Sequence, residues 1–276
     1  MRILLLIFCL CYTAGMIIAA TDVKRETNKQ NTSQNIKKNN EVKLNLSDKP
    51  GKQSDYSIIK NISDGKYEAA LNLIKSKKAD VNECEEKTGK TPLMFAAILA
   101  KRESVAELID AKADVNAQDT IYNLTPLIYA CITGDVQSAA FLIEAGADVN
   151  YRAPNGLTPL RCAVDGNKKV LMNFLIEKKA DVNLKNANGK TVLMAAAEKG
   201  NDSLINLLIK AGADINEQDY GGETALILAV KKKKTETVAL LLKNKAQKNI
   251  TNNWNETALD FAKNNKDNKI INLLEK

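Results

Sequence analysis

The chain of 276 residues carries no histidine, the side chain that most often serves as a general base, activates a Ser or Cys nucleophile or binds a metal ion. It also has no glycine-rich loop of the kind that holds phosphate groups. The residue types that the commonest hydrolytic, metal-dependent and nucleotide-dependent sites require are therefore missing. We predict a protein that is not an enzyme and that uses no cofactor, no metal ion and no small-molecule substrate.

Three of the five cysteines lie beyond residue 20: Cys84, Cys131 and Cys162. Their odd number and wide spacing favour thiols over a disulfide framework. We interpret Cys131 and Cys162 as small buried residues that replace alanine, because a cysteine thiol packs like a small apolar group. A metal or catalytic site at these residues is the less favoured alternative.

The elements that hold these residues repeat along the chain. A threonine recurs with one step of 34 residues and then steps of 33, at Thr91, Thr125, Thr158, Thr191, Thr224 and Thr257. An Asp-Val-Asn sequence or a variant begins 23 residues after each of the first five threonines, at Asp114, Asp148, Asp181, Asp214 and Gln247. Because the spacing inside each unit is constant, differences in length lie in the connecting segments. Such self-similarity indicates a repeat protein.

The unit that begins at Thr125 predicts two short helices joined by a turn. Thr125 is a suitable N-cap, and Pro126 fits the first helical position because its φ is already helical. Gly134 can take a positive φ and end the first helix, and Gly146 can end the second in the same way. Two helices this short cannot shield their apolar faces alone, so each unit needs neighbours to stack against.

Three segments with these marks closely resemble the ankyrin repeat family: Thr-Pro-Leu-Met-Phe-Ala-Ala, Ala-Gly-Ala-Asp-Val-Asn and Lys-Ala-Gly-Ala-Asp-Ile-Asn. The resemblance covers about residues 56–276. It implies an all-α solenoid of stacked antiparallel helix pairs, with a β-hairpin finger at each junction. It also accounts for the Asp-x-Asn sequences as the entrances to those fingers rather than as calcium loops.

One position departs from the family pattern. The family often has a histidine three residues after the threonine, where this chain has Met94, Ile128, Arg161, Met194, Ile227 and Asp260. The turn bond that such a histidine supplies is therefore expected to be missing. We expect this loss to lower the stability of single repeats and to leave the fold unchanged.

We predict that residues 55–276 form one ankyrin repeat domain of about seven repeats. Its first repeat has Tyr56 in the place of the threonine and Asn61 in the place of an alanine. The polar first helix of this repeat suits a terminal unit without an upstream neighbour. The last repeat carries a sparse apolar stripe among charged and amide side chains. Both end repeats are therefore expected to be caps.

Residues 1–20 predict a secretory signal peptide, because Arg2 precedes an apolar run that ends in Ala19 and Ala20. Cleavage would leave an exported protein, periplasmic or secreted. An uncleaved N-terminal membrane anchor is the alternative, since the run is near the length that spans a bilayer. Residues 21–54 are polar, and we predict a disordered tether that cannot bury enough apolar surface to fold.

The charge of the chain is concentrated in that tether, which holds eight Lys or Arg and four Asp or Glu. Only about two of the seven net positive charges remain for the repeats. This argues against a basic surface for nucleic acid along the whole array. The lysine run Lys231–Lys234 is interpreted as a solvated helix end rather than as a site for an acidic partner.

The resemblance places the recognition surface on a concave face, formed by fingertips and by the two residues before the turn that ends each first helix. In the second and third repeats these positions are apolar, and exposed apolar groups gathered in this way mark a partner site. The predicted partner-binding residues are Ile98, Leu99, Ile121, Tyr122, Leu124, Ile132 and Tyr151. The alternative is that these side chains pack finger against finger. Tyr220 and Trp254, in later fingers, are weaker candidates.

The favoured hypothesis is a monomeric, non-catalytic scaffold that binds another protein outside the cytoplasm. The alternative is a periplasmic stress- or cell-wall-related factor, or a secreted effector, with an unrecognised activity. The absence of histidine and of any globular segment outside the repeats favours the scaffold.

Overall fold

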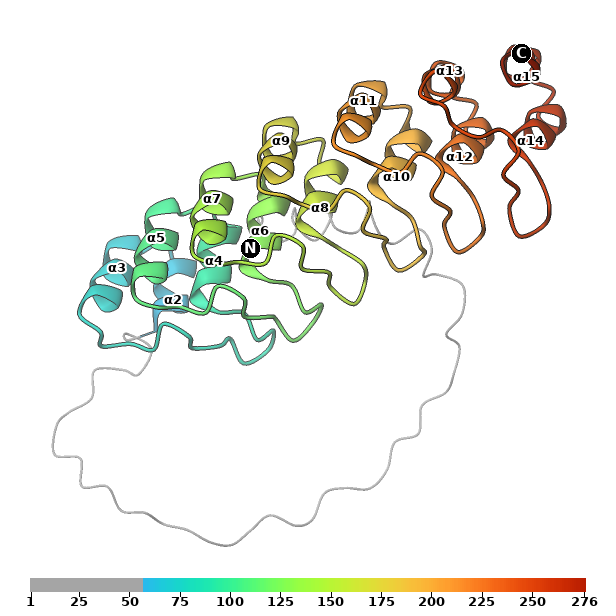
Figure 1. Cartoon of the computed structure of the whole chain (residues 1–276). Helices are drawn as coiled ribbons and strands as arrows, with labels where there is room; N and C mark the ends of the chain where they lie inside the picture. Colours follow the sequence, from blue (N-terminus) through green and yellow to red (C-terminus); the bar gives the residue numbers. More distant parts are fainter. Residues whose placement is uncertain (1–56) are drawn as a thin grey trace, which may run out of the picture. The chain divides into compact units, whose positions relative to one another are not determined.

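The computed structural model describes residues 57–276, and the predicted leader (1–20) and tether (21–54) lie outside the described residues. The described residues form seven consecutive helix pairs, numbered here as repeats 1 to 7 (Figure 1). The first helices are α2 (Ile58–Ser63), α4 (Pro92–Ile98), α6 (Pro126–Thr133), α8 (Pro159–Asp165), α10 (Val192–Lys199), α12 (Ala225–Lys231) and α14 (Ala258–Asn264). The second helices are α3 (Tyr67–Lys75), α5 (Arg102–Asp110), α7 (Val136–Glu144), α9 (Lys169–Glu177), α11 (Asp202–Lys210), α13 (Thr235–Lys243) and α15 (Asn268–Glu275). No helix within residues 57–276 is long and apolar enough to span a membrane.

The first helices of repeats 2 to 7 begin at the recurrent threonine. Thr125 Oγ1 accepts a hydrogen bond from the Ile128 backbone N–H at 3.4 Å, and Pro126 follows at the first helical position. All six threonines cap their helices in this way. The short first helices therefore start at defined points, because each cap satisfies a backbone donor that the first turn leaves without a partner.

Repeat 1 begins one residue later than the sequence alignment predicts. Its N-cap is Ser57, whose hydroxyl accepts from the Lys60 N–H at 3.1 Å, whereas the aligned Tyr56 lies outside the described residues. Ser57 Oγ also donates to Glu83 Oε1 at 2.9 Å. The difference arises because Glu83 holds Ser57 from the segment that follows α3, a long-range contact that no local alignment contains.

In three repeats the side chain three residues after the threonine bonds back to the cap. Met94 Sδ accepts from the Thr91 backbone N–H at 3.5 Å, and Met194 makes the same contact in repeat 5 at 3.4 Å. Asp260 Oδ2 accepts from the backbone N–H and the hydroxyl of Thr257, at 2.8 and 2.6 Å. The expected loss of a turn bond is thus wrong in repeats 2, 5 and 7, where a sulfur or a carboxylate oxygen is the acceptor.

The helix pairs stack so that the first helices form one row and the second helices another (Figure 1). Each first helix contacts the first helix of the next repeat, from α2 to α14. The apolar core runs along this stack, and Leu142 of α7 is completely buried in it, as are Leu175, Leu208 and Leu241 at the same position of later repeats. Each repeat thus covers the apolar faces of its neighbours, as the shortness of the helices requires.

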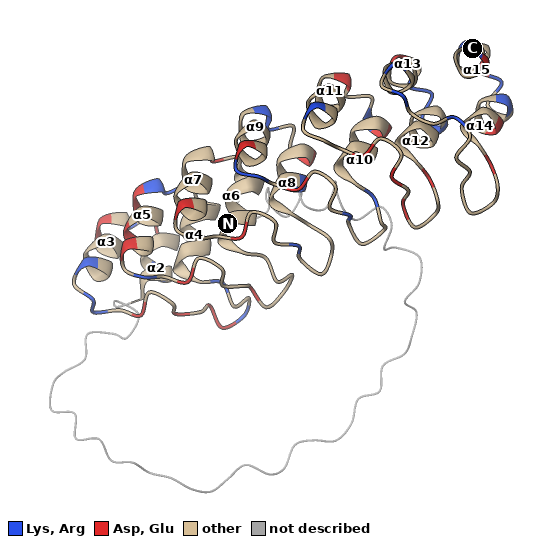
Figure 2. Ribbon diagram, in the orientation of Figure 1, with Lys and Arg blue, Asp and Glu red and all other residues tan. Residues whose placement is uncertain are grey.

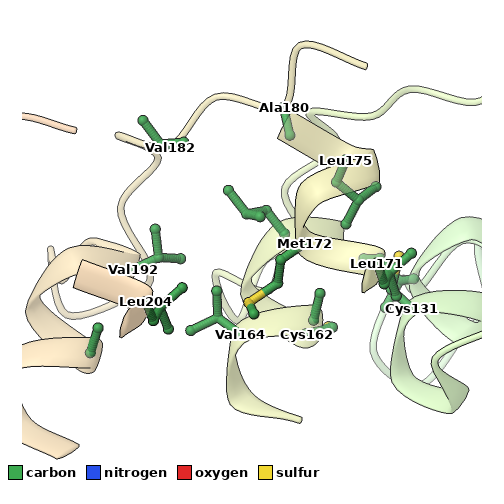
Figure 3. Close-up of a cluster of buried hydrophobic side chains, with 14 of the residues drawn as sticks. Cys131, Cys162, Val164, Leu171, Met172, Leu175, Ala180, Val182, Val192 and Leu204 are labelled. Atoms are coloured by element: carbon green, nitrogen blue, oxygen red, sulfur yellow. The ribbon is translucent and has the colours of Figure 1, made fainter. Parts of the chain in front are cut away.

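Two of the three cysteines belong to this core. Cys131 and Cys162 are buried among apolar side chains such as Leu171 and Val164 (Figure 3). Burial raises the pKa of the Cys131 thiol well above its usual value, so this group is not a thiolate at neutral pH. Cys84 is exposed, and the cysteines of the described residues form no disulfide. The burial agrees with the interpretation of Cys131 and Cys162 as small core residues.

The predicted β-hairpin fingers are tight turns, and residues 57–276 contain no strand. One backbone hydrogen bond crosses the base of each finger, for example from Asp119 N to Leu124 O at 3.1 Å and from Asn252 N to Glu256 O at 3.0 Å, and most fingers add one turn bond, such as that from Asn255 N to Asn252 O at 3.0 Å. Bonds between neighbouring fingers are also single, such as that from Tyr220 N to Asn188 O at 3.2 Å. The fingers are therefore too short to establish a ladder of paired strands.

The asparagines of the Asp-x-Asn sequences link consecutive repeats. Asn116 Oδ1 accepts from the Asp148 backbone N–H at 3.0 Å, and Asn150 Oδ1 accepts from the Asp181 N–H at 2.8 Å. Asn82, Asn183 and Asn216 accept the same bond from the backbone N–H at the start of the next motif. The first residue of the motif turns the chain locally, since Asp148 Oδ1 accepts from the Asn150 N–H at 2.8 Å. These residues therefore build the junctions between repeats, as the resemblance implies.

The turn between the two helices of a repeat needs one residue with positive φ. Gly134 has φ 84° and is the C-cap of α6, as predicted. At the same position Ala100 has φ 51° and Lys233 has φ 55°. Side chains with a Cβ are strained in this left-handed region, so repeats 2 and 6 keep the fold at some cost in stability.

Candidate protein-binding surface

The base of each finger and the end of the first helix that follows it meet at an angle, and the side chains on the inside of this angle face one another. We call this place the inner angle. Two positions eight residues apart define this angle: the residue before the capping threonine and the residue seven after it. In repeat 5 the Nζ of Lys190 lies 2.9 Å from Glu198 Oε1, and in repeat 6 Lys231 pairs with Glu223. We call the surface lined by these positions and by the fingertips the concave face.

The concave face of repeats 2 and 3 is without charge along its helices. Neither α4 nor α6 carries a charged residue, and both are drawn without blue or red in Figure 2. At their ends Ile98, Leu99 and Ile132 are half-buried, packed on the core with one side open to solvent. Phe95, one turn earlier in α4, is also half-buried and was not among the predicted residues.

The fingertip of repeat 3 carries the exposed apolar side chains. Ile121 and Tyr122 are 50% and 48% exposed, among the most exposed large apolar residues of the described chain. Val170, Tyr220 and Trp254 are more exposed still, but they lie in repeats 4 to 7. Ile121 and Tyr122 therefore stand where the sequence places a partner-binding tip.

Two predicted contact residues are held by contacts within the fold. Leu124 is only 5% exposed, because the base of the finger belongs to the core. Tyr151 is half-buried, and its hydroxyl donates to Asn123 O of the preceding finger at 2.6 Å. Burial, with a smaller contribution from Asp119, raises the pKa of the Tyr151 hydroxyl, which therefore stays a donor. Leu124 therefore packs in the core, whereas Tyr151 packs against the preceding finger, as the alternative interpretation expects.

Asp119 fixes the fingertip from beneath. Its carboxylate is 1% exposed, and Oδ1 accepts from the backbone N–H groups of Ile121 at 2.9 Å and Tyr122 at 2.7 Å. The hydroxyl of Tyr129 in α6 donates to Oδ2 at 2.6 Å. Because both oxygens are occupied by donors, the buried charge is compensated and the tip is held in one conformation.

Sequence reasoning missed Asp119, although a signal for it exists. An Asp or Asn lies five or six residues before four of the capping threonines, at Asp119, Asn186, Asp219 and Asn252. In each case one side-chain oxygen accepts from two backbone N–H groups of its own finger. The recurrence is thus the mark of a built fingertip.

The charged side chains on the concave face of repeats 4 and 5 are engaged in ion pairs with one another. Arg161 Nε lies 2.7 Å from Asp165 Oδ2, and Lys199 Nζ approaches Asp165 Oδ1 at 3.2 Å from the next repeat. With the pair of Lys190 and Glu198, each acid of this stretch faces a base. A ligand in contact with this part must disturb existing ion pairs.

Of the four lysines at the end of α12 and in the turn that follows it, two pack on neighbouring residues of the fold. Lys231 pairs with Glu223 and lies 4.9 Å from the centre of the Phe261 ring, and the side chain of Lys234 lies against Gly200. Lys232 and Lys233 are exposed, and within residues 57–276 neither makes an ion pair or a side-chain hydrogen bond. The run is therefore only partly a solvated helix end.

The described residues offer no metal centre, since no group of three or more Cys, Asp or Glu side chains in residues 57–276 could hold an ion. What the arrangement supplies is a neutral helix surface beside a rigid fingertip. Such a surface suits contact with an apolar or aromatic group of another molecule.

Comparisons with known proteins agree with this architecture. A family model described as ankyrin repeats (3 copies) matches residues 58–153 and 150–219, and one described as ankyrin repeats (many copies) matches residues 208–262. A search of curated proteins found no match. Among solved structures, the ankyrin repeat domain of Bcl-3, described as a unique member of the IkappaB protein family, is similar, with a TM-score of 0.71 and 26% sequence identity over 79% of this chain and 97% of that one.

Proposed function

Because this chain belongs to the ankyrin repeat family, whose members are in general protein-interaction scaffolds, we propose that it is a non-catalytic scaffold that binds another protein through repeats 2 and 3. One observation carries the choice of site. Tyr122 and Ile121 project from a fingertip that the buried Asp119 carboxylate holds in place, beside helices without charge.

The rigidity of this tip favours binding. An aromatic side chain on a fixed backbone offers a large contact area and loses little conformational freedom when a partner covers it. The uncharged ends of α4 and α6 add apolar area whose removal from water requires no ion to be desolvated. Energy in protein interfaces concentrates in a few such anchors, and Tyr122 is the foremost of them here.

We further infer that the protein acts outside the cytoplasm and binds its partner as a monomer. Support for export comes only from the order of Arg2, an apolar run and Ala19 and Ala20 in the leader. N-terminal sequencing of the protein from its native cells should find cleavage near Ala19 or Ala20. Recovery of intact Met1 in the membrane fraction would instead establish the anchored form.

Affinity capture with the full-length protein tests the proposed function. Partners retained by the parent protein are identified by mass spectrometry and captured again with Tyr122→Ala and with Tyr220→Ala. Tyr220 is the matched control, because it is an exposed tyrosine at a later fingertip, 65% exposed. A partner that Tyr122→Ala loses and Tyr220→Ala keeps would support the site. A partner lost only by the control would contradict it.

A further inference from the structure

The two positions that line the concave face beside each inter-helix turn change character along the array. They are apolar in repeat 2, as Ile98 and Leu99, and apolar and hydroxyl in repeat 3, as Ile132 and Thr133. In repeats 4 and 5 their charged members, Asp165, Glu198 and Lys199, are engaged in ion pairs. In repeat 6 they begin the lysine run.

Lys232 and Lys233, called the lysine pair below, are two adjacent exposed cations that make no ion pair within residues 57–276. Glu223, at the inner position of the same repeat, is already held by Lys231. Lys266, at the position of Lys233 in repeat 7, is also exposed and makes no ion pair within residues 57–276. A negative ligand group at this end would gain a partner without breaking a bond, whereas at Lys199 it would have to replace Asp165.

We propose that the partner presents a ligand in two parts: an apolar or aromatic group that docks at repeats 2 and 3, and an acidic cluster that meets the lysine pair. This inference rests on the proposed function, since it takes Tyr122 and its surroundings as the first docking point. Charge complementarity decides the second point, because within residues 57–276 the lysine pair makes no ion pair.

The spacing of the repeats gives the required separation of the two parts. Neighbouring helices pack about 10 Å apart, so the path from repeat 3 to repeat 6 measures about 30 Å. An extended peptide covers this distance with about nine residues. Over repeats 4 and 5, between the two points, the charged side chains already pair with one another, so this stretch requires no charged group of the peptide.

A peptide is favoured over nucleic acid as the occupant. A phosphate polymer would present negative charge along its whole length, including the uncharged helices α4 and α6, where no cation of the helices answers it. A peptide can confine its negative charge to one end. The ligand is thus an extended acidic segment with an apolar anchor at a set distance.

Synthetic peptides test the proposal with the full-length protein. Each labelled peptide carries Trp-Leu at one end and a run of glutamates at the other, joined by a Gly-Ser spacer of about three, nine or fifteen residues, in both chain directions. The peptide with about nine spacer residues should bind at least about tenfold more tightly than the shortest one, because only it reaches both points. The advantage should disappear in high salt, which screens the acidic contact.

Substitutions at the lysine pair test whether it is the site that binds the acidic end of the peptide. In Lys232→Glu/Lys233→Glu the advantage of the nine-residue spacer should be lost, with an unchanged circular dichroism spectrum as the folding check. The matched control is Lys210→Glu/Lys243→Glu, which makes the same charge change on exposed residues of the second helices and should leave the advantage intact.

Three results would overturn the inference. These are equal binding of all spacer lengths, an advantage that survives in Lys232→Glu/Lys233→Glu, and equally tight, equally salt-sensitive binding of single-stranded DNA of similar length. Should Tyr122→Ala abolish capture of the natural partner while the peptides show no length preference, the proposed function would stand and only the two-part ligand would fail.

Discussion

Repeats 3 and 6 share the same helix-pair architecture but differ in the charge of their concave surfaces. Both have a capping threonine, a buried leucine in the second helix and a tight-turn finger. At the inner angle, however, repeat 3 has Leu124 and Ile132, whereas repeat 6 has Glu223 and Lys231. The repeat template constrains the positions that touch neighbouring repeats and leaves these two open to change. Function should therefore be sought in what differs between repeats, and stability in what they share.

Substitution of the buried leucine in each second helix tests whether repeats 3 and 6 share one core. Leu142→Ala should lower the free energy of unfolding by about 2 to 5 kcal/mol, since it removes buried methyl groups and leaves a cavity. Leu241→Ala, at the same position of repeat 6, should cost a similar amount. Urea denaturation measures both. A near-zero cost at one of the two would mean that the repeats do not share one core.

Binding measurements test the uncharged surface that distinguishes repeats 2 and 3 from the later repeats. Tyr122→Ala should weaken affinity for the captured partner by about 1 to 3 kcal/mol with little effect on folding, because fingertips lie away from the core. Leu99→Asp, which places a charge in the uncharged stretch, should weaken the same interaction. Calorimetric titration measures both. The site would have to be abandoned if both variants bound like the parent while changes at Lys231 and Lys232 abolished binding.

The turn between the helices offers a smaller test of stability. Ala100→Gly should raise the free energy of unfolding by about 1 kcal/mol, because glycine adopts the positive φ of 51° without strain from a Cβ. Lys233→Gly should give a similar gain in repeat 6. Thermal melts of the two variants provide the measurement. Destabilisation by either change would show that its side chain contributes more than the strain costs.

The last and smallest effect concerns pH. Hydrogen bonds from the Thr257 hydroxyl and backbone N–H lower the pKa of Asp260 below its usual value. A carboxyl with a lower pKa in the folded state stabilises the fold above its unfolded pKa of about 4, and this contribution is lost as the pH falls through the folded value. Repeats 2 and 5 have a methionine in the same place and lack this dependence.

Asp260→Asn should therefore leave a shallower decline of stability on acidification below about pH 4 than the parent shows. Melting temperatures measured between about pH 2 and pH 6 compare the two proteins. Parallel curves would mean that the bond to Thr257 does not form in solution. Met194→Leu is a suitable control, because it removes a neutral acceptor and should shift the curve without changing its shape.

Most of the fold could be predicted from the sequence because the repeat is a local rule applied many times. Thr125, Pro126 and Gly134 specify where a helix starts and ends through contacts within a few residues. The start of repeat 1 could not be placed in the same way, because Glu83, 26 residues from Ser57, decides it. Nor does the sequence show that Met94 and Asp260 accept the cap bond expected of a histidine, because this bond depends on side-chain geometry at the cap.

The candidate surface was also predicted in part from the sequence and decided in part by the tertiary structure. The sequence by itself determined which positions lie on the concave face, and that they are apolar in repeats 2 and 3 and charged later. Only the tertiary structure decided which of those side chains are accessible: Tyr122 remains exposed, whereas Leu124 is in the core and Tyr151 is bonded to Asn123. The physical reason is that exposure depends on the neighbouring finger, which lies about one repeat away in sequence. Likewise, only the structure separated Lys231 and Lys234, which pack on adjacent repeats, from Lys232 and Lys233, which do not.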